Sequence, residues 1–431
     1  MQTNPSRGRS RDLVLFIFSI VGVVGLAGRG IYLLVTGILN YDPQSIPALA
    51  SNCLEALSMW VCAALVLPML ITSFRQWKGR EIPQSRIPPV KFWQVAAAFG
   101  IWIFVVVIGG LITISFSYGW LVAAPFFLVG ILLPVAGLLW VIMGGLPTGS
   151  WRRLWSALGI GMTGSTVLAV VGEYLLLALG VAIVGIASIG HPEWLTALKQ
   201  LQSQVKQAQD TQALATLLAP YLVNPFVLLA VLIFASGFVP LIEESVKPLA
   251  VWLLGKKLHS PAEGFALGAL GGAGFALVEG FMSASGNPTV LGVGVAARAT
   301  SSLMHITASA VLGWGIASAF LEKRYGRLAL AYLTSMTIHG LWNGAALLTV
   351  YGALRFSTQP LNPDIVGMVL ALGGVSVLGL QLVVLLIALP LINRRLRSRL
   401  PVTVSHLPEA APATQNDIIA PPNPGETGPT V

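Results

Sequence analysis

Long apolar runs fill most of this chain and limit what it can fold into. About ten of them are long enough to cross a lipid hydrocarbon core, which takes about 20 residues of α-helix. They lie near residues 13–38, 50–73, 93–115, 120–145, 155–182, 225–255, 263–285, 298–320, 328–350 and 366–392. A backbone within lipid must satisfy its own hydrogen bonds, which favours helices. The sequence therefore predicts an all-α, polytopic membrane helix bundle of about ten transmembrane helices.

Charge supports this class and predicts the orientation of the chain. Only 10% of the residues are charged, against about 25% in soluble domains. The basic residues form short clusters between the apolar runs, so we expect a membrane-lipid environment and no nucleic acid partner. Predicted cytoplasmic segments hold about 19 Lys and Arg residues and predicted outer segments about four. Both termini are therefore expected in the cytoplasm.

The chain divides into five predicted parts. These are membrane helices at 1–190, an outer loop at 191–221, helices at 222–350 that carry the polar residues described next, a last membrane helix at 351–399, and a tail at 400–431. Residues 155–190 are expected to form one long or tilted helix. The outer loop has apolar residues at near-helical spacing, which predicts an amphipathic helix on the outer surface, either packed on loop ends or serving as a substrate lid. The tail is rich in Pro and Ala and is expected to be disordered.

Ionisable residues inside the apolar runs mark the candidate site. Glu243, Glu244 and Lys247 share one run, although a charged group at bilayer depth costs about 2.5–3.5 kcal/mol on insertion scales. The next three runs carry Glu279, His305, and His339 with Asn343. Counted from the predicted cytoplasmic ends at 1.5 Å per residue, one residue of each run falls at a similar depth, about 18–22 Å. We therefore expect the four helices to contribute to a single site.

Two local features fit such a site. Pro248 deprives the Glu244 carbonyl of its usual helical donor, which predicts a kink or break at this depth. Broken backbone there is tolerated only beside a polar cavity or within protein. Glycines at 264, 268 and 272 give two GxxxG spacings, which would allow a close helix contact and bring Glu279 towards the glutamate pair.

The chemistry that these side chains offer is hydrolytic. Of two neighbouring carboxylates, one can act as the base that deprotonates water, and histidines with Asn343 can donate to an oxyanion. Glu243, Glu279, His305 and His339 could also hold a divalent metal such as zinc. The sequence has no HExxH motif and no cysteine ligand cluster, so the cofactor remains open at this stage.

The order of these residues resembles that of PrsW-type intramembrane proteases, which belong to the wider superfamily of CAAX-processing and bacteriocin-processing membrane proteases. The matching elements are Glu243-Glu244-x-x-Lys247, Phe275-x-x-x-Glu279, His305, and His339-Gly-x-Trp342-Asn343, within about 225–350. The resemblance implies a protein of the bacterial plasma membrane that cleaves membrane-anchored protein substrates. It implies Glu243 as the water-activating base, Glu244 beside it, and His339 with Asn343 as the oxyanion-stabilising pair. Glu279, where the CAAX branch has histidine, favours the PrsW branch.

Other functions are compatible with the same residues. A proton- or ion-coupled transporter also uses intramembrane carboxylates and histidines, but the first five runs contain no counterpart of the glutamate pair, as repeated transporter halves would. An inactive scaffold would retain the pair for packing, neutralised by Lys247. Lys247 itself is expected to be a structural counter-ion, Arg298 an interfacial anchor, and Glu173 a residue at the outer boundary or hydrogen-bonded within the bundle.

Overall fold

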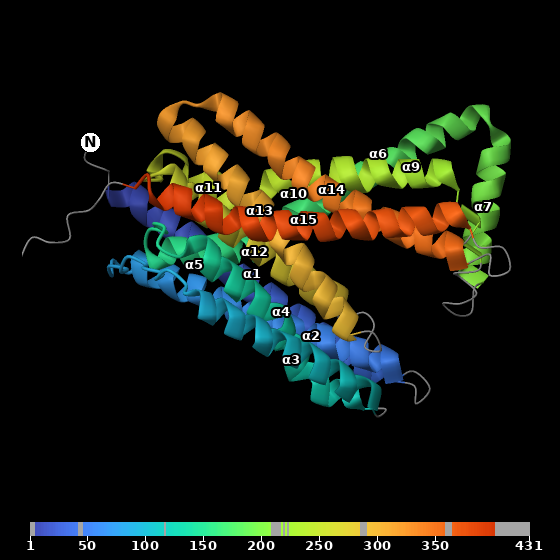
Figure 1. Ribbon diagram of the computed structural model, residues 1–431, viewed down its shortest axis with the longest axis horizontal. Helices are drawn as coiled ribbons and strands as arrows, with labels where there is room; N and C mark the ends of the chain where they lie inside the picture. The colour runs from blue at the N-terminus through green and yellow to red at the C-terminus, as the bar shows by residue number, and fades with distance from the viewer. Residues whose placement is uncertain are drawn as a thin grey trace, which may run out of the picture.

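The computed structural model describes residues 5–41, 46–115, 118–207, 217–218, 220–221, 224–284, 291–357 and 364–400. Helices account for most of this part of the chain. In order they are α1 (Pro5–Leu39), α2 (Ile46–Trp77), α3 (Phe92–Ser115), α4 (Gly119–Met143), α5 (Trp151–Ile160), α6 (Thr166–Ala187), α7 (Pro192–Gln207), α9 (Pro225–Ile233), α10 (Val239–Val246), α11 (Leu249–Leu254), α12 (Pro261–Ala284), α13 (Leu291–Glu322), α14 (Tyr325–Ser357) and α15 (Ile365–Arg397). The predicted helical membrane bundle is confirmed (Figure 1).

Within the described ranges, nine helical stretches are long and apolar enough to cross a membrane. One of them runs without interruption from Trp151 to Gly190, through the π-helical segment η1 (Gly161–Ser165). Another, Pro225–Val246, joins α9 to α10 through a second π-helical segment, η3 (Phe234–Phe238). The remaining predicted span, 328–350, coincides with α14, which is 33 residues long. Polar residues such as His339 and Asn343 make α14 less apolar than the nine.

Helices α12 and α13 form the buried centre of the bundle. Within their most apolar stretches, 89% and 83% of the residues are buried, against at most 44% in the other spans. Figure 1 shows the two helices between the group α1–α5 and the group α9, α14 and α15. Polar side chains on α12 and α13 therefore face protein rather than lipid, which is where ionisable groups are tolerated in a membrane.

Glycines set the distance between these two central helices. Gly264, Gly268 and Gly272 follow one another at four-residue intervals along the face of α12 that meets α13. A methyl group added at Gly272 would come within 2.6 Å of the His305 carbonyl oxygen, and one at Gly268 would overlap the Ser309 carbonyl oxygen. The close contact that the GxxxG spacings predict is therefore present, and it positions the backbone of His305.

The predicted break at Pro248 is also present. Helix α10 ends at Val246 and α11 begins at Leu249, so Lys247 and Pro248 lie in a turn. The Lys247 carbonyl accepts a hydrogen bond from the Ser165 hydroxyl of η1 at 3.4 Å, and Gly271 of α12 lies directly against it. Protein thus surrounds the broken turn, which is the condition for irregular backbone at membrane depth.

Helix α7 lies across one end of the bundle, transverse to α9 and α15 (Figure 1). Its apolar Leu195 and Val205 are exposed. The predicted helix of the outer loop is therefore present in its first half, while its role as lid or packing element remains a prediction. Residues 208–216 and the tail from 401 to 431, where disorder is predicted, lie outside the described residues.

Replacing Gly268 with alanine should push α12 and α13 apart. Overpacking of this kind costs about 1–3 kcal/mol, so the purified full-length variant should unfold at a lower temperature in detergent. The matched control is Gly373→Ala in α15, where an added methyl group meets nothing within 4 Å. Equal unfolding temperatures for the two variants would contradict the proposed contact.

Candidate active site

Four ligand-type side chains from three helices meet inside the bundle. Glu243 and Glu244 come from the end of α10, His305 from the middle of α13, and His339 from α14. One donor atom of each lies within 4.8 Å of the chosen donor atoms of the others, and all four side chains are buried. The single site expected from their shared depth is therefore assembled, with Glu279 joined to it only through His305.

Glu244 is fully engaged by the protein. Its Oε1 accepts hydrogen bonds from Lys247 Nζ at 2.6 Å and from His339 Nδ1 at 2.9 Å. Its Oε2 accepts hydrogen bonds from the hydroxyls of Ser335 at 2.8 Å and Ser309 at 3.5 Å. Four donors nearly exhaust the acceptor capacity of a carboxylate. Glu244 therefore links α10, α13 and α14 and has little capacity left for a further ligand.

Glu243 differs from its neighbour in this respect. Its Oε2 lies 2.8 Å from Lys247 Nζ and 3.8 Å from His339 Nε2. Neither contact has the direction of a hydrogen bond, and this buried oxygen has no hydrogen-bond partner among the described residues. Of the two adjacent glutamates, Glu243 is therefore the one with an oxygen available to a water molecule or a metal ion.

Lys247 occupies the centre of the cluster. Its ammonium nitrogen lies 2.8 Å from Glu243 Oε2 and 2.6 Å from Glu244 Oε1. The same nitrogen is 2.7 Å from His305 Nδ1 and 3.4 Å from His339 Nδ1. Lysine is fully buried here, and its position matches that of the expected counter-ion to both carboxylates.

Each histidine has one ring nitrogen beside a carboxylate. His339 Nδ1 donates to Glu244, and His305 Nε2 lies 2.7 Å from Glu279 Oε2. These contacts assign the protons to His339 Nδ1 and His305 Nε2. His305 Nδ1 and His339 Nε2 then carry lone pairs, and the two rings meet edge to face with centroids 5.0 Å apart.

Asn343 supports His339 from the next turn of α14. Its amide nitrogen lies 3.2 Å from His339 Nε2 and donates to the Ala235 carbonyl of η3 at 2.8 Å. Gly340, on the same face of α14, lies against the Ser236 carbonyl. Both amide hydrogens of Asn343 thus face protein acceptors, so a role as oxyanion donor requires one of these contacts to open.

Comparison with known proteins identifies the family of the chain. The model of a family described as PrsW family intramembrane metalloprotease matches residues 149–372, slightly more than half of the sequence. The chain belongs to this family. Comparisons with curated proteins and with solved structures gave no match. The match runs from just before α5 into α15, and it contains the whole cluster of Glu243, Glu244, His305 and His339.

The family description names a metal, and the donor set fits one. Two carboxylates and two imidazoles are ligands that suit Zn²⁺ or a related divalent ion. Metal-bound histidines usually have their other nitrogen held by a carboxylate or carbonyl, as His305 and His339 do with Glu279 and Glu244. Glu243 Oε2, which accepts no hydrogen bond and is paired only with Lys247 and His339, adds a ligand atom. Lys247 Nζ lies between these donors, so an ion bound by them would displace it.

Arg298 forms an ion pair that its predicted role as an interfacial anchor did not include. Its guanidinium nitrogen lies 2.7 Å from Glu279 Oε1, while Oε2 of the same carboxylate faces His305. Glu279 therefore bridges Arg298 and His305 rather than approaching the glutamate pair. The reason is geometric, because α12 packs closely along α13, which carries both Arg298 and His305.

The sequence does not place three further polar residues at this PrsW-family site, although Glu173 is expected at the outer boundary or hydrogen-bonded within the bundle. Ser309 and Ser335 hydrogen-bond Glu244, yet serines are common in membrane helices and carry no distinguishing signal. Glu173 of α6 lies close to Glu243 of α10. The neighbouring Gly172 allows this approach, because a methyl group there would come 2.8 Å from Ile242 of α10. A carboxylate within the fifth predicted span was the available signal.

Removing the charge of Glu244 should weaken the whole cluster. Glu244→Gln leaves Lys247 with one carboxylate partner, and breaking a buried ion pair costs about 3–5 kcal/mol. Thermal unfolding of the purified protein should show a large loss of stability. The control is Glu322→Gln, because the partly exposed pair of Glu322 with Arg327 is worth about 0–1 kcal/mol. Similar losses in both variants would contradict the linking role of Glu244.

Proposed function

We propose that this protein hydrolyses peptide bonds of membrane-anchored substrates with a water molecule activated by Glu243. Membership of the PrsW family makes it an intramembrane protease. The observation that carries it is the difference between the two adjacent glutamates. Glu244 is saturated by four donors, whereas Glu243 keeps one buried oxygen without a hydrogen bond.

In this mechanism Glu243 first accepts a proton from water. The water oxygen attacks the scissile carbonyl carbon, and the carbonyl oxygen becomes an oxyanion. Glu243 then returns the proton to the amide nitrogen as the C–N bond breaks, which releases an amine and a carboxylic acid. A single carboxylate, that of Glu243, therefore both accepts and returns the proton.

Asn343 would donate to the oxyanion, and His339, whose Nδ1 proton is held by Glu244, would position Asn343 through its Nε2. Asn343 Nδ2 is 3.2 Å from His339 Nε2, so a small rotation would exchange this contact for one to the substrate oxygen. Glu244 and Ser335 keep the His339 ring and the surrounding helices in register. Removal of one oxyanion donor in other hydrolases costs about 100- to 1,000-fold in rate.

If a divalent ion binds, its ligands would be Glu243, His305 and His339, with Glu244 as the fourth member of the cluster. The ion would supply Lewis-acid polarisation of the carbonyl and lower the pKa of a bound water molecule. Glu279 and Glu244 would orient the two imidazoles. Such an ion would compete with Lys247 Nζ for the lone pairs of Glu243 and His305.

The position of the site limits the substrate. Its residues are buried inside a bundle of membrane-spanning helices, so a peptide bond reaches them only by entering that bundle. A protein segment already anchored in the membrane satisfies this condition. We therefore propose a membrane-tethered protein as the substrate class.

Glu243→Gln should abolish cleavage of a fluorescent single-span reporter protein reconstituted with the purified enzyme. Loss of a general base reduces the rate by about 100- to 10,000-fold. Glu55→Gln is the control. Glu55 also lies in a membrane helix, but it pairs with Arg29 of α1, and neither residue belongs to the cluster. Cleavage at the wild-type rate by Glu243→Gln would contradict the assignment. Ion flux into liposomes that disappears in the same variant would favour a transporter instead.

Metal content tests the ligand set separately from activity. Elemental analysis of purified protein after incubation with Zn²⁺ should give about one ion per chain, because a single donor cluster is proposed. The double variant His305→Ala/His339→Ala should bind no ion. Lys247→Met should retain it more strongly, since the competing ammonium is gone. His191→Ala, at an exposed histidine before α7, is the control. Wild-type protein that holds no ion yet cleaves the reporter would exclude the metal and leave Glu243 as base.

A further inference from the structure

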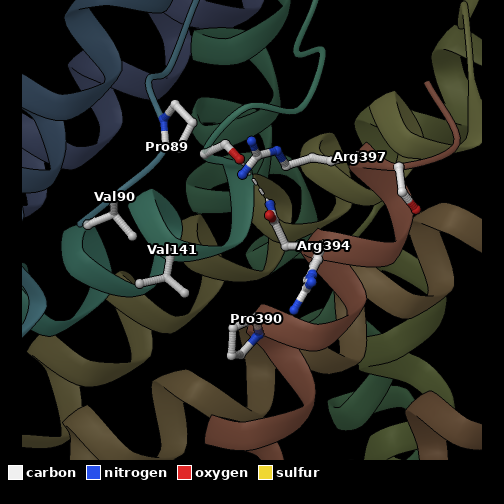
Figure 2. A pocket seen from close by; sticks show the side chains of 9 residues that line it. Pro89, Val90, Val141, Pro390, Arg394 and Arg397 are labelled. Carbon is white, nitrogen blue, oxygen red and sulfur yellow. Dashed lines mark hydrogen bonds between the residues drawn. The ribbon is translucent and has the colours of Figure 1, made fainter. Parts of the chain in front are cut away.

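A cavity of about 570 Å³ lies between the C-terminal end of α15 and the C-terminal end of α4. Its wall includes Pro89 from the segment before α3, Val141 of α4, and Pro390, Asn393, Arg394 and Arg397 of α15. Figure 2 shows the two arginines on α15 across from Pro89, Val90 and Val141. All of these residues lie outside the range 149–372 that matches the protease family. The cavity is therefore separate from the catalytic cluster.

The cavity is positively charged and has no acidic side chain in its wall. Arg394 and Arg397 are three residues apart and so lie on one face of α15. Both are exposed, and neither forms an ion pair with any residue of the described ranges. Two guanidinium groups without a carboxylate partner form a site for an anion, and guanidinium matches phosphate in geometry.

The wall around these arginines is held by directed contacts. Asn393 Nδ2 donates to the carbonyls of Ile142 at 2.7 Å and Gly144 at 3.1 Å, which fixes α15 against the end of α4. Gly145 has a φ of +76°, and a methyl group added there would come 2.7 Å from Arg397 Nε. The turn thus leaves room for the Arg397 side chain to lie over it. Packing and hydrogen bonds between α15 and the end of α4 therefore define the shape of the cavity.

Its location matches the headgroup level of a membrane. The spanning helix α15 ends at this cavity, at the end of the bundle predicted to face the cytoplasm. Trp140 donates its indole N–H to the Pro88 carbonyl at 3.0 Å beside the cavity, and tryptophan is typical of the membrane–water interface. Valine and proline line the same cavity, so it offers apolar contacts next to its charges.

We propose that this cavity binds the phosphate-bearing headgroup of an anionic phospholipid. Arg394 and Arg397 would contact the phosphate, and Val90, Val141 and Pro390 would contact the glycerol and the first acyl carbons. Basic pockets between membrane helices on the cytoplasmic side are known to bind anionic headgroups. A free phosphate compound offers the same charge but lacks the acyl carbons, so it would bind more weakly.

Native mass spectrometry of the full-length protein in detergent tests this assignment. Phosphatidylglycerol and phosphatidylcholine with identical acyl chains serve as the two lipid probes. The variant pair Arg394→Gln/Arg397→Gln should weaken phosphatidylglycerol binding by about 30-fold, because each basic residue at an anionic membrane surface is worth about a factor of five. The matched pair Arg395→Gln/Arg399→Gln removes the same charge from the same end of α15 without altering the cavity wall, and it should bind almost as the wild type does.

Two further arms keep the outcome decisive. Arg394→Lys/Arg397→Lys retains the charge and should retain most of the lipid binding. This variant still tests the proposal if the glutamine pair does not fold. Inorganic phosphate and glycerol 3-phosphate at millimolar concentration should not displace the lipid. The proposal is overturned if wild type shows no preference for phosphatidylglycerol, or if both glutamine pairs lose binding equally. Displacement by the soluble phosphates would overturn the lipid as the source of the headgroup.

Discussion

The ion cluster around Lys247 is the interaction on which the rest of this structure depends. An ammonium and two carboxylates cannot remain charged inside a lipid-embedded bundle unless each finds partners, because removal from water costs several kcal/mol per ion. Lys247 therefore contacts both glutamates and both histidines. Those contacts require α10, α13 and α14 to meet at one level, which in turn requires the turn at Pro248 and the small residues around it.

The central helices provide the protein surroundings that this cluster requires. Gly264, Gly268 and Gly272 bring α12 against α13 almost backbone to backbone. Such contact replaces lipid with protein on most faces of α13 and leaves His305 held between Lys247 and Glu279. The apparent weakness of α12 and α13 as membrane helices, with their modest apolarity, is thus a consequence of their place at the centre.

Much of this arrangement could be predicted from the sequence, and the limits have physical reasons. The spans, the break at Pro248 and the meeting of Glu243, Glu244, His305 and His339 follow from apolar length, proline chemistry and common depth. Depth along an axis says nothing of rotation about it. The sequence therefore could not distinguish the saturated Glu244 from the partly free Glu243, nor place Glu173 beside it. The same limitation left Arg298 at the interface in the prediction, whereas the close packing of α12 and α13 pairs it with Glu279.

The spacing of the charges at the end of α10 and in the turn after it bears on how the chain enters the membrane. Lys247 follows Glu243 and Glu244 by four and three residues, so one short segment of chain carries both signs on one side. During biogenesis, local pairing with Lys247 can offset one of the two carboxylate charges before the later helices have been synthesised. The histidines of α13 and α14 then join an ion pair that is already in place. If the same charges lay on separate helices, each would stay unpaired in lipid until the helix with its partner had been inserted.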